Sequence, residues 1–479
     1  MPAGPGFYGT FAIIFNSIPL KRNLFFLLIL LFLLACSKKQ ATTVVVPVTP
    51  AVTDTTPSQY GTPFGDVPDR QDAVIYQVNM RAFSSQANFQ GVIARLDSIK
   101  ALGVNVIYLM PIYPVGKVKT VNSPYCVKDY TAVNTEFGTL ADLRSLVDGA
   151  HGRNMSVIID WVANHTSWDN GWITSHKDWY LQDGSGNVVS PPGKGWNDVA
   201  QLDFTKAAMR LKMIWDMKYW VLAANVDGFR CDYADGPPLD FWTQAIDTLR
   251  HISTHKLLIL AEGSRSANFL AGFDYNFGFG YYGLLKSIYS SNVSALQINN
   301  MNITEYANAS DGQQVVRYTS NHDVNGSDGT PLELFGGRTG SMAAFVVTAC
   351  MKGVPMVYNG QEVGTPYRIV FPFTGAKINW TLNPDIMAEY KKILLFRSSS
   401  AALRRGQLSS LGDADICTFT KELAGEKVLV VANLRNHVVN FALPLQLQNT
   451  TWTNALTGDS IRMNTQLVLQ SYSYLIAKQ

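Results

Sequence analysis

The stretch LADLRSLVDGAHGRNMSVIID (140–160) joins a segment with helical spacing to a run that is nearly continuous in apolar character. The run MSVIID (155–160) is short and contains β-branched residues, as expected of a strand that is buried on both faces. More runs of this kind follow the same pattern at residues 73–78, 104–110, 226–231, 257–262, 273–277, 315–320 and 355–359. Segments with helical spacing, such as 89–103 and 209–224, separate most of them. The sequence therefore predicts an α/β fold, a (β/α)8 TIM barrel.

Two departures from this alternation divide the chain further. After the third strand comes a polar segment rich in Gly and Trp, residues 165–203, which is too long for a barrel loop and predicts a small inserted subdomain. From residue 398 to 479 the pattern changes to short alternating strands with turns and without helices, which predicts a C-terminal antiparallel β-sandwich domain. The barrel with its insertion is then expected to span residues 66–397.

The insertion is unusually rich in tryptophan. Five tryptophans lie in it or beside it, namely Trp161, Trp168, Trp172, Trp179 and Trp196. Such a group of aromatic rings is typical of a sugar-binding platform, and it is equally typical of the small core of an inserted subdomain. The sequence leaves both interpretations open.

Composition and charge exclude several classes of function. The chain has 479 residues, with 39 Lys and Arg against 36 Asp and Glu, and only 16% of its residues are charged. An extended nucleic-acid surface is therefore not expected. Apolar residues make up 47% and aromatic residues 11%, which fits a folded enzyme or sugar-binding protein. The five cysteines are too scattered for a disulfide framework or a zinc site.

The N-terminus carries the features of an export signal. Lys21 and Arg22 precede an apolar run at 24–35, which has the length of a signal-peptide core. The run ends in LLAC (33–36), which resembles the bacterial lipoprotein box, in which cleavage precedes the cysteine and that cysteine carries the lipid. We therefore expect residues 1–36 to be a lipoprotein signal peptide with lipidated Cys36. The alternative is an uncleaved anchor helix or a buried cysteine.

The segment that follows Cys36 is rich in Ser, Thr, Val and Pro, and residues 37–65 are expected to form an extended linker. Together these features predict an extracytoplasmic protein that is lipid-anchored to a bacterial membrane, in the periplasm or at the cell surface. Its oligomeric state is left open.

Polar side chains follow the predicted barrel strands at the point where each strand ends. They occur in DWVANH (160–165), DGFRCD (227–232), Glu262 and NHD (321–323). Each alone is typical of a turn or a helix cap. Because a closed barrel brings the carboxyl ends of all its strands to one rim, these side chains are expected to meet there. Asp232 and Glu262 would supply the carboxyl pair that glycosidic cleavage requires.

The motif set resembles that of the α-amylase family of retaining glycoside hydrolases, family 13. The resemblance extends from IYQVNMRAFS (75–84) and GVNVIYLMPIYP (103–114) to GVPMVYNGQEVG (353–364) and the terminal β domain. It implies that Asp232 is the nucleophile, Glu262 the general acid and base, and Asp323 a third carboxylate that grips sugar hydroxyl groups.

The resemblance also implies the roles of the neighbouring residues. Arg230 would keep Asp232 ionised through its positive charge. His165 and His322 would bind hydroxyl groups of the sugar ring at the cleavage point, and Tyr125 would stack on that ring. Asp160 is expected to be structural, and Cys231 to point away from Arg230 and Asp232 as a buried thiol.

Two features limit what the resemblance implies about calcium. Many α-amylases have Lys and His three and four residues after the nucleophile, where this chain has Asp235 and Gly236. Asn164 matches the family's usual calcium ligand, but its partners within the insertion cannot be chosen among Asp169, Asp178, Asp183 and Asp198. No cofactor is expected to be required, and Asn164 is kept as a candidate calcium ligand.

The sequence thus predicts a retaining α-glucan hydrolase acting on starch, glycogen or maltodextrins, with α-1,4 bonds favoured. The alternatives are an exo-α-glucosidase or transglycosylase of the same family, and a catalytically silent glucan-binding lipoprotein. A pure binder has no need of three carboxylates that repel each other, which argues against the silent protein. Three choices depend on loops and are left open. They are α-1,4 or α-1,6 bonds, internal or terminal cleavage, and hydrolysis or transfer.

Overall fold

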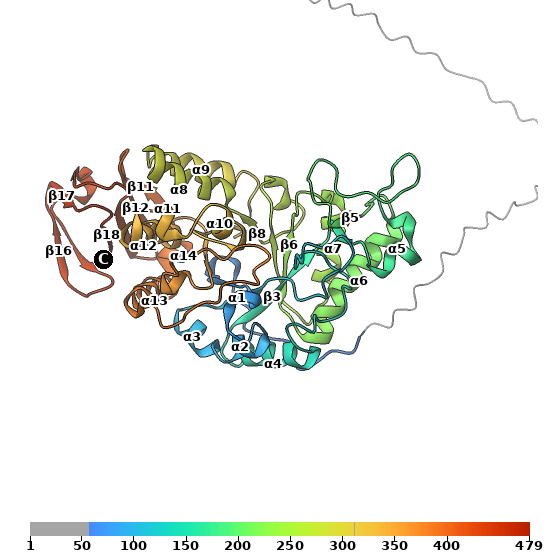
Figure 1. Ribbon diagram of the computed structural model, residues 1–479. Coiled ribbons are helices and arrows are strands. Elements are labelled where there is room, and N and C mark those ends of the chain that lie inside the picture. Colours follow the sequence, from blue (N-terminus) through green and yellow to red (C-terminus); the bar gives the residue numbers. More distant parts are fainter. Residues whose placement is uncertain (1–56, 311) are drawn as a thin grey trace, which may run out of the picture. The chain divides into compact units, whose positions relative to one another are not determined.

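The computed structural model describes residues 57–310 and 312–479 (Figure 1). The predicted signal peptide, Cys36 and most of the predicted linker therefore lie outside the described residues. Within the described part of the chain, no helix is both long enough and apolar enough to cross a membrane.

Eight parallel strands close into a barrel, as the sequence predicts, in the spatial order β1-β10-β9-β8-β7-β6-β3-β2. Their bounds are β1 (Ile75–Val78), β2 (Val106–Leu109), β3 (Ser156–Val162), β6 (Gly228–Asp232), β7 (Leu258–Ala261), β8 (Tyr275–Phe277), β9 (Gln314–Arg317) and β10 (Val354–Tyr358). Every residue of these strands is buried, because side chains on one face fill the barrel and those on the other face pack against helices.

Helices follow the strands, and the longer ones lie around the outside of the barrel (Figure 1). Their bounds are α1 (Met80–Phe83), α2 (Phe89–Ile93), α3 (Leu96–Ala101), α4 (Leu140–His151), α6 (Ala207–Ala224), α7 (Leu239–Arg250), α8 (Phe279–Ser291), α9 (Gln297–Glu305), α10 (His322–Ser327), α11 (Pro331–Leu334), α12 (Gly337–Cys350) and α13 (Pro384–Ser399). Short 3₁₀ turns occur at η1 (Arg70–Asp72), η3 (Ser266–Asn268) and η4 (Gln361–Val363). The helical segment predicted at 89–103 is two helices, broken where Arg95 lies over the Trp380 ring at 4.0 Å.

The insertion after β3 is a small subdomain, as predicted. It contains β4 (His165–Ser167), α5 (Gly171–Ser175), η2 (Lys177–Trp179) and β5 (Val199–Gln201). β4 and β5 form an antiparallel pair, in which His165 lies opposite Gln201. Because only two residues separate the end of β3 from the start of β4, the insertion starts directly at the barrel rim.

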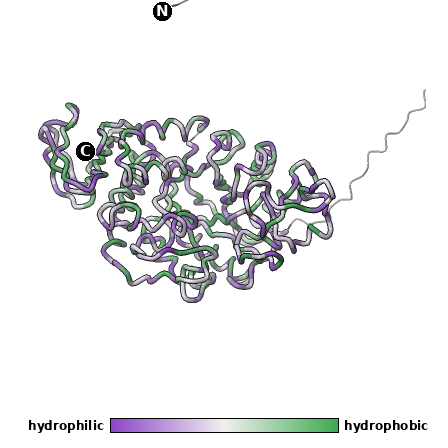
Figure 2. The backbone as a smooth tube through the Cα atoms, turned by 45° about the horizontal axis from the view of Figure 1, so that its top comes forward, coloured by the Kyte–Doolittle hydropathy of each residue, from purple (hydrophilic) through white to green (hydrophobic). Residues whose placement is uncertain are grey.

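The C-terminal part is built from antiparallel sheets. Its elements are α14 (Ala401–Arg405), β11 (Gln407–Ser410), β12 (Ile416–Leu423), β13 (Glu426–Asn433), β14 (Val439–Ala442), η5 (Leu445–Leu447), β15 (Thr450–Asn454), β16 (Ser460–Met463), β17 (Gln466–Leu469) and β18 (Tyr474–Lys478). One sheet has the order β11-β12-β13-β18-β15-β16, and β14 pairs with β17. Hydrophilic and hydrophobic segments are intermixed in this part of the chain (Figure 2). Phe441 of β14, Trp452 of β15 and Leu469 of β17 belong to one buried cluster, so side chains of the two sheets share a core.

The prediction that no helix follows residue 398 is wrong. Helix α14 begins after Ser400, whose side chain accepts a hydrogen bond from the Leu403 amide, and Glu426 of β13 accepts one from the Ala402 amide at 2.9 Å. The helix is thus stabilised from a strand more than twenty residues away, which periodicity in a short segment cannot reveal. The boundary placed between residues 397 and 398 stays a prediction.

Candidate active site

A cavity of about 930 Å³ opens at the carboxyl ends of the barrel strands. Its lining includes Asp232 at the end of β6, Glu262 after β7, and Asp323 near the start of α10. Tyr125, His165 and His322 also line it. Six of the residues singled out from the sequence therefore share one cavity, although their positions in the chain span almost 200 residues.

Asp232 and Glu262 are held by the same guanidinium group. Arg230 Nη1 donates to Asp232 Oδ1 at 2.9 Å, and Arg230 Nη2 lies 2.7 Å from Glu262 Oε1. Nη1 also donates to Asp160 Oδ1 at 2.7 Å. The Arg230 side chain is fully buried beneath the cavity, whereas the Asp232 and Glu262 side chains are 12% and 14% exposed. The two carboxyl groups thus lie side by side at the cavity floor.

Sharing one cation among three carboxyl groups changes the expected electrostatics. Burial raises the pKa of Asp232, Arg230 lowers it, and the negative charges of Glu262 and Asp160 raise it again. Arg230 therefore favours the ionised form of Asp232, as predicted. Its effect is smaller than that of burial, so the pKa of Asp232 is raised overall. Burial likewise raises the pKa of Asp160 to about 6, against the lowering effects of Arg230 and Tyr108.

Asp160 has the structural role that the sequence indicates. Besides Arg230, its carboxylate accepts hydrogen bonds from Tyr108 Oη at 2.6 Å and Tyr125 Oη at 3.1 Å. Its side chain is fully buried and does not line the cavity. It therefore fixes Arg230 from below and orients Tyr125 at the cavity wall.

His322 is held by two residues from other elements. Gln77 Nε2 lies 2.7 Å from His322 Nδ1, and Tyr125 Oη lies 2.6 Å from His322 Nε2. Because an amide nitrogen can only donate, Nδ1 accepts and the ring proton lies on Nε2, where Asp323 Oδ1 is 3.3 Å away. Burial lowers the pKa of His322 to about 3, so the ring is neutral. Asp323 is the most open carboxylate of the site, with 55% of its side chain exposed.

His165 lines the cavity from the start of the insertion. Burial lowers its pKa to about 4, so this ring is neutral as well. Its neighbour Asn164 does not line the cavity. Asn164 Nδ2 donates to Gln201 Oε1 at 3.0 Å, and Gln201 Nε2 donates back to the Asn164 backbone carbonyl at 3.1 Å.

This environment of Asn164 does not fit a calcium ion well, because its amide is paired with another amide and no carboxylate joins it. Of the four aspartates considered, Asp169 accepts from the Lys117 amide and Asp183 accepts from the amides of its own turn. Across residues 57–310 and 312–479, no group of three or more His, Cys, Asp or Glu residues comes together in a way that could hold a metal ion. Calcium binding at Asn164 stays a prediction.

Residues 77–237 match the family model described as "Alpha amylase, catalytic domain". Alpha-amylase 3 of Dictyoglomus thermophilum is 23% identical over 478 residues, covering 85% of this chain and 93% of that protein. The crystal structure of an alpha-amylase from Lactobacillus plantarum superposes with a TM-score of 0.76 and 26% identity, covering 86% of this chain and 99% of that chain. The chain carries an α-amylase catalytic domain. It is an α-amylase-type glycoside hydrolase.

Another relative is the cyclomaltodextrinase of Thermoanaerobacter pseudethanolicus. It is 24% identical over 377 residues, covering 72% of this chain and 63% of that protein. The matched residues of the family model include the β3 and β6 motifs of this α-amylase domain but end before Glu262 and Asp323. Those two carboxylates line the same cavity as Asp232.

Asp235 and Gly236, which stand where many α-amylases have Lys and His, have structural roles in this α-amylase domain. Asp235 accepts hydrogen bonds from the Ser264 amide at 2.8 Å, from Arg265 Nε at 3.1 Å and from Asn268 Nδ2 at 3.0 Å. It therefore ties the loop after β6 to the loop after β7. Gly236 leaves room for the Tyr233 ring, since a Cβ atom there would lie 2.5 Å from it.

The five tryptophans in or beside the insertion do not all have the same environment. Some form a core, and one lines the cavity, where a sugar-binding platform is expected. Trp172 and Trp179 meet at 5.2 Å between ring centroids and form the small core of the insertion, while Trp161 is buried in the barrel. Trp168 lies beneath the Lys119 ammonium group. Of the five, Trp196 is the one that lines the cavity.

Three residues of the α-amylase site were missed by sequence reasoning. Gln77 on β1 and Tyr108 on β2 are polar members of predicted strands, and that isolated polarity is the signal that could have found them. Tyr233 directly follows Asp232 and lines the cavity with a φ of 41°, which its sequence position does not indicate.

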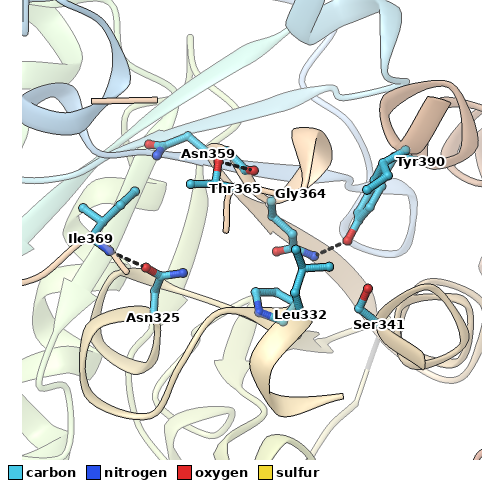
Figure 3. Close-up of a pocket in the computed structure, with 12 residues that line it drawn as sticks. Asn325, Leu332, Ser341, Asn359, Gly364, Thr365, Ile369 and Tyr390 are labelled. Atoms are coloured by element: carbon cyan, nitrogen blue, oxygen red, sulfur yellow. Dashed lines mark hydrogen bonds between the residues drawn. The ribbon is translucent and has the colours of Figure 1, made fainter. Parts of the chain in front are cut away.

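A second, much smaller cavity is lined in part by Asn325 of α10 (Figure 3). It shares no lining residue with the first. Its volume of about 10 Å³ is near the size of one water molecule. Around it, Asn325 accepts a hydrogen bond from the Ile369 amide at 2.7 Å, and Gln361 donates to Tyr390 Oη at 3.0 Å. Because α10 carries His322 and Asp323, the bond between Asn325 and the Ile369 amide helps to hold the helix that bears these two residues.

Proposed function

We propose that this α-amylase-type hydrolase cleaves α-1,4-glucosidic bonds of starch, glycogen or maltodextrins with retention of configuration. The observation that carries the proposal is that one guanidinium group holds Asp232 and Glu262 together at the cavity floor. Retaining enzymes need such a close pair, with the carboxyl groups about 5–5.5 Å apart. Relatives named α-amylase and cyclomaltodextrinase support an α-glucan as the substrate.

In the first step, Glu262 donates its proton to the glycosidic oxygen while a carboxylate oxygen of Asp232 attacks the anomeric carbon. The bond between that carbon and the glycosidic oxygen breaks, and the leaving sugar departs with a new hydroxyl group. In the second step, Glu262 takes a proton from a water molecule, which attacks the anomeric carbon and releases Asp232. Two inversions at one carbon give net retention.

The remaining residues bind the sugar at the cleavage point. His322 carries its proton on Nε2, which lies 2.6 Å from Tyr125 Oη and 3.3 Å from Asp323 Oδ1, so a sugar hydroxyl group would receive this proton in place of Tyr125 while Asp323 accepts hydrogen bonds. His165 is neutral and also lines the cavity. Tyr125 presents an aromatic ring to the C–H face of a pyranose. Both steps use only carboxyl groups and water, so no cofactor takes part in them.

We also propose that Cys36 is lipidated and holds the enzyme on the outer side of a bacterial membrane. The support is the sequence alone, namely the basic pair at 21–22, the apolar run at 24–35 and Ala35 before Cys36. Expression of the full chain and of a Cys36→Ser variant with radiolabelled palmitate tests this. Label and membrane recovery that persist in the variant would contradict lipidation at Cys36.

The activity is tested by incubating the full chain in detergent with maltoheptaose, amylose and pullulan, beside an Asp232→Asn variant. We expect a series of maltodextrins from the first two substrates, absent in the variant, and an α-anomer as the first product by proton NMR. Glucose or one fixed product would favour the exo-acting enzyme, and products from pullulan alone would favour α-1,6 cleavage. Binding without products would favour the silent glucan-binding protein.

A further inference from the structure

Three positively charged side chains are buried together where the barrel meets the C-terminal sheet. Lys421 of β12 donates to the Met351 carbonyl at 3.4 Å, and Arg397 Nη2 of α13 donates to the Gly353 carbonyl at 3.0 Å. Arg317, the last residue of β9, packs against the same glycine, since a Cβ atom there would lie 3.3 Å from Arg317 Cδ. These three side chains form a basic cluster around the turn between α12 and β10.

The basic cluster is remote from the active-site cavity. Its turn directly precedes β10, at the amino end of that strand, whereas the cavity opens at the carboxyl ends. None of the three side chains lines the cavity. Arg317 and Arg397 are 0% exposed, and Lys421 is 4% exposed. The cluster therefore has a role other than catalysis.

The charge of the basic cluster is not balanced by carboxylates. Glu305 pairs with Arg317 Nη2 at 2.9 Å, and within residues 57–310 and 312–479 no other carboxylate forms an ion pair with the three cations. Burial lowers the pKa of Arg397 to about 10, and burial together with the charge of Arg397 lowers the pKa of Lys421 to about 7. Both shifts reflect how unfavourable a buried positive charge is without a counter-ion.

The two guanidinium groups also have hydrogen-bond donors without acceptors. Nε and Nη1 of Arg317, and Nε and Nη1 of Arg397, are buried and have no hydrogen-bond partner in the described part of the chain. Buried donors are almost always paired, because an unpaired one loses its hydrogen bonds to water on folding. Both arginines contact Gly353, so their unpaired donors indicate a shared acceptor that the chain itself does not supply.

Another arginine between the barrel and the C-terminal sheet shows how this fold satisfies a buried guanidinium group by itself. Arg435 follows β13 and is 4% exposed. Its Nε donates to Asp415 Oδ1 at 2.8 Å, its Nη1 to the Ile288 carbonyl at 2.6 Å and its Nη2 to the Val293 carbonyl at 2.9 Å. Every nitrogen is paired and a carboxylate balances the charge. Arg397 differs from it in both respects.

A single acceptor with a negative charge would meet both needs of the cluster. Water can accept the hydrogen bonds but leaves the charge unbalanced, whereas a small anion does both. The anion must be small, because the cluster is closed off from solvent and the Arg317 guanidinium lies over the Tyr281 ring at 4.3 Å. Lys352 on the turn is partly exposed, so it offers an ion a positively charged approach from solvent.

We propose that Arg317, Arg397 and Lys421 bind one small monovalent anion, such as chloride, at the turn between α12 and β10. The ion accepts hydrogen bonds from the unpaired guanidinium nitrogens and offsets positive charge that Glu305 does not balance. Because the two arginines belong to the barrel and Lys421 to the C-terminal sheet, the bound ion joins these two parts of the protein. Its role is stability, and the inference does not rest on the proposed function.

The first test measures thermal unfolding of the full chain in detergent at pH 7 and constant ionic strength, with sodium gluconate replaced stepwise by sodium bromide. Gluconate is too large for the closed cluster, so only bromide should bind. Each tenfold rise in bromide above its Kd should raise the Tm by roughly 1–2 °C, as mass action predicts for a chain of this size. In Lys421→Met, which keeps a long side chain without the charge, this rise should be lost.

The matched control is Lys427→Met, since Lys427 lies on the neighbouring strand β13 and pairs with Glu422 at 3.6 Å outside the basic cluster. Its Tm should rise with bromide as in the unchanged protein. Arg397→Lys serves if Lys421→Met does not fold, because it keeps the charge but removes the unpaired guanidinium nitrogens. A rise that persists in full in the variant that folds would overturn the inference.

Diffraction from crystals grown in sodium bromide locates the ion through the anomalous signal of bromine. We expect a peak in contact with the guanidinium groups of Arg317 and Arg397. A peak confined to Arg230 in the active site or to the protein surface, or no peak at all, would overturn the proposal. Neither measurement uses catalytic activity, so failure here is distinguishable from failure of the proposed function.

Discussion

Gln77 Nε2 lies 2.7 Å from Nδ1 of His322, although 245 positions separate the two residues in the chain. Both side chains are buried, and the bond assigns the ring proton of His322 to Nε2. Strand β1 thus contributes to the active site a residue that does not itself line the cavity. Gln77 therefore controls which ring nitrogen of His322 carries the proton.

Replacing Gln77 separates this effect from simple packing. In Gln77→Leu the proton of His322 is no longer directed to Nε2, and we expect kcat to fall roughly fivefold, the effect of losing one hydrogen bond of about 1 kcal/mol. In Gln77→Glu the carboxylate accepts a proton from Nδ1, which should turn the ring tautomer or charge it. Nitrogen NMR shifts of the His322 ring report the tautomer directly. An Nε2–H ring in both variants would contradict the assignment.

The two proposed catalytic carboxyl groups should differ in their dependence on the leaving group. Glu262→Gln removes proton donation, which contributes about 10²–10⁴-fold, so kcat on maltoheptaose should fall by that factor. Hydrolysis of α-maltosyl fluoride depends less on the acid in its first step and should then stop at the glycosyl-enzyme, visible as an added mass on the intact protein. Asp232→Asn should give no such added mass. A glycosylated Asp232→Asn protein would exclude Asp232 as the nucleophile.

Removing Arg230 should destabilise the fold in a pH-dependent manner. Arg230→Met leaves Asp160, Asp232 and Glu262 without their shared cation, and breaking a buried pair costs about 3–5 kcal/mol. Because burial raises the pKa of Asp160 to about 6, that carboxyl group takes up a proton at pH 5, and the loss of unfolding free energy should be smaller there than at pH 8.

Urea unfolding at both pH values measures this difference. Arg338→Met is the matched control, since Arg338 is 46% exposed and pairs with Asp385 at the surface, where ion pairs contribute little. Equal losses for the two variants would contradict the role of Arg230 as the shared counter-ion.

Lys421 makes stability depend on alkaline pH. It lies buried on β12, donates to the Met351 carbonyl at 3.4 Å, and burial together with the charge of Arg397 lowers its pKa to about 7. In the unfolded chain the pKa of Lys is about 10.4. Between these values the unfolded state binds the proton and the folded state does not, so stability rises with pH from about 7 to 10.

In Lys421→Met this rise should be smaller. The free energy of unfolding of the variant should exceed that of the unchanged protein by the largest amount at pH 7 and below. The difference in unfolding free energy between the two proteins, measured in urea at pH 7 and pH 10, gives the effect without the contribution of other groups. A difference that is the same at both pH values would show that Lys421 titrates normally.

Chelation tests the candidate calcium ligand. Since Asn164 is paired with Gln201 and no carboxylate joins it, we expect the Tm in EDTA to equal the Tm in calcium within about 1 °C, because only a bound ion stabilises by mass action. A rise of Tm with calcium that Asn164→Ala abolishes would instead support the family's calcium site.

The fold was predictable where a segment carries its own signal. The eight barrel strands were each found because burial on both faces makes them nearly continuously apolar. The segment 89–103 also has a clear helical period, yet the chain breaks at Arg95, which lies over Trp380 from a distant loop. Helix α14 was missed for the same reason, since Glu426 of a later strand stabilises its first turn.

The sequence by itself determined the barrel and the insertion after the third strand. It also determined that Asp232, Glu262 and Asp323 line one cavity, because strand-end motifs in a closed barrel must converge on one rim. Only the tertiary structure decided which hydrogen-bond and ion-pair partners surround those groups. Arg230 is shared by three carboxyl groups, Gln77 reaches His322 from another strand, and Tyr233 joins Trp196 of the insertion to Glu262. The physical reason is that hydrogen bonds and charges act over a few ångströms in space, whereas these partners lie from tens to hundreds of residues apart in the chain.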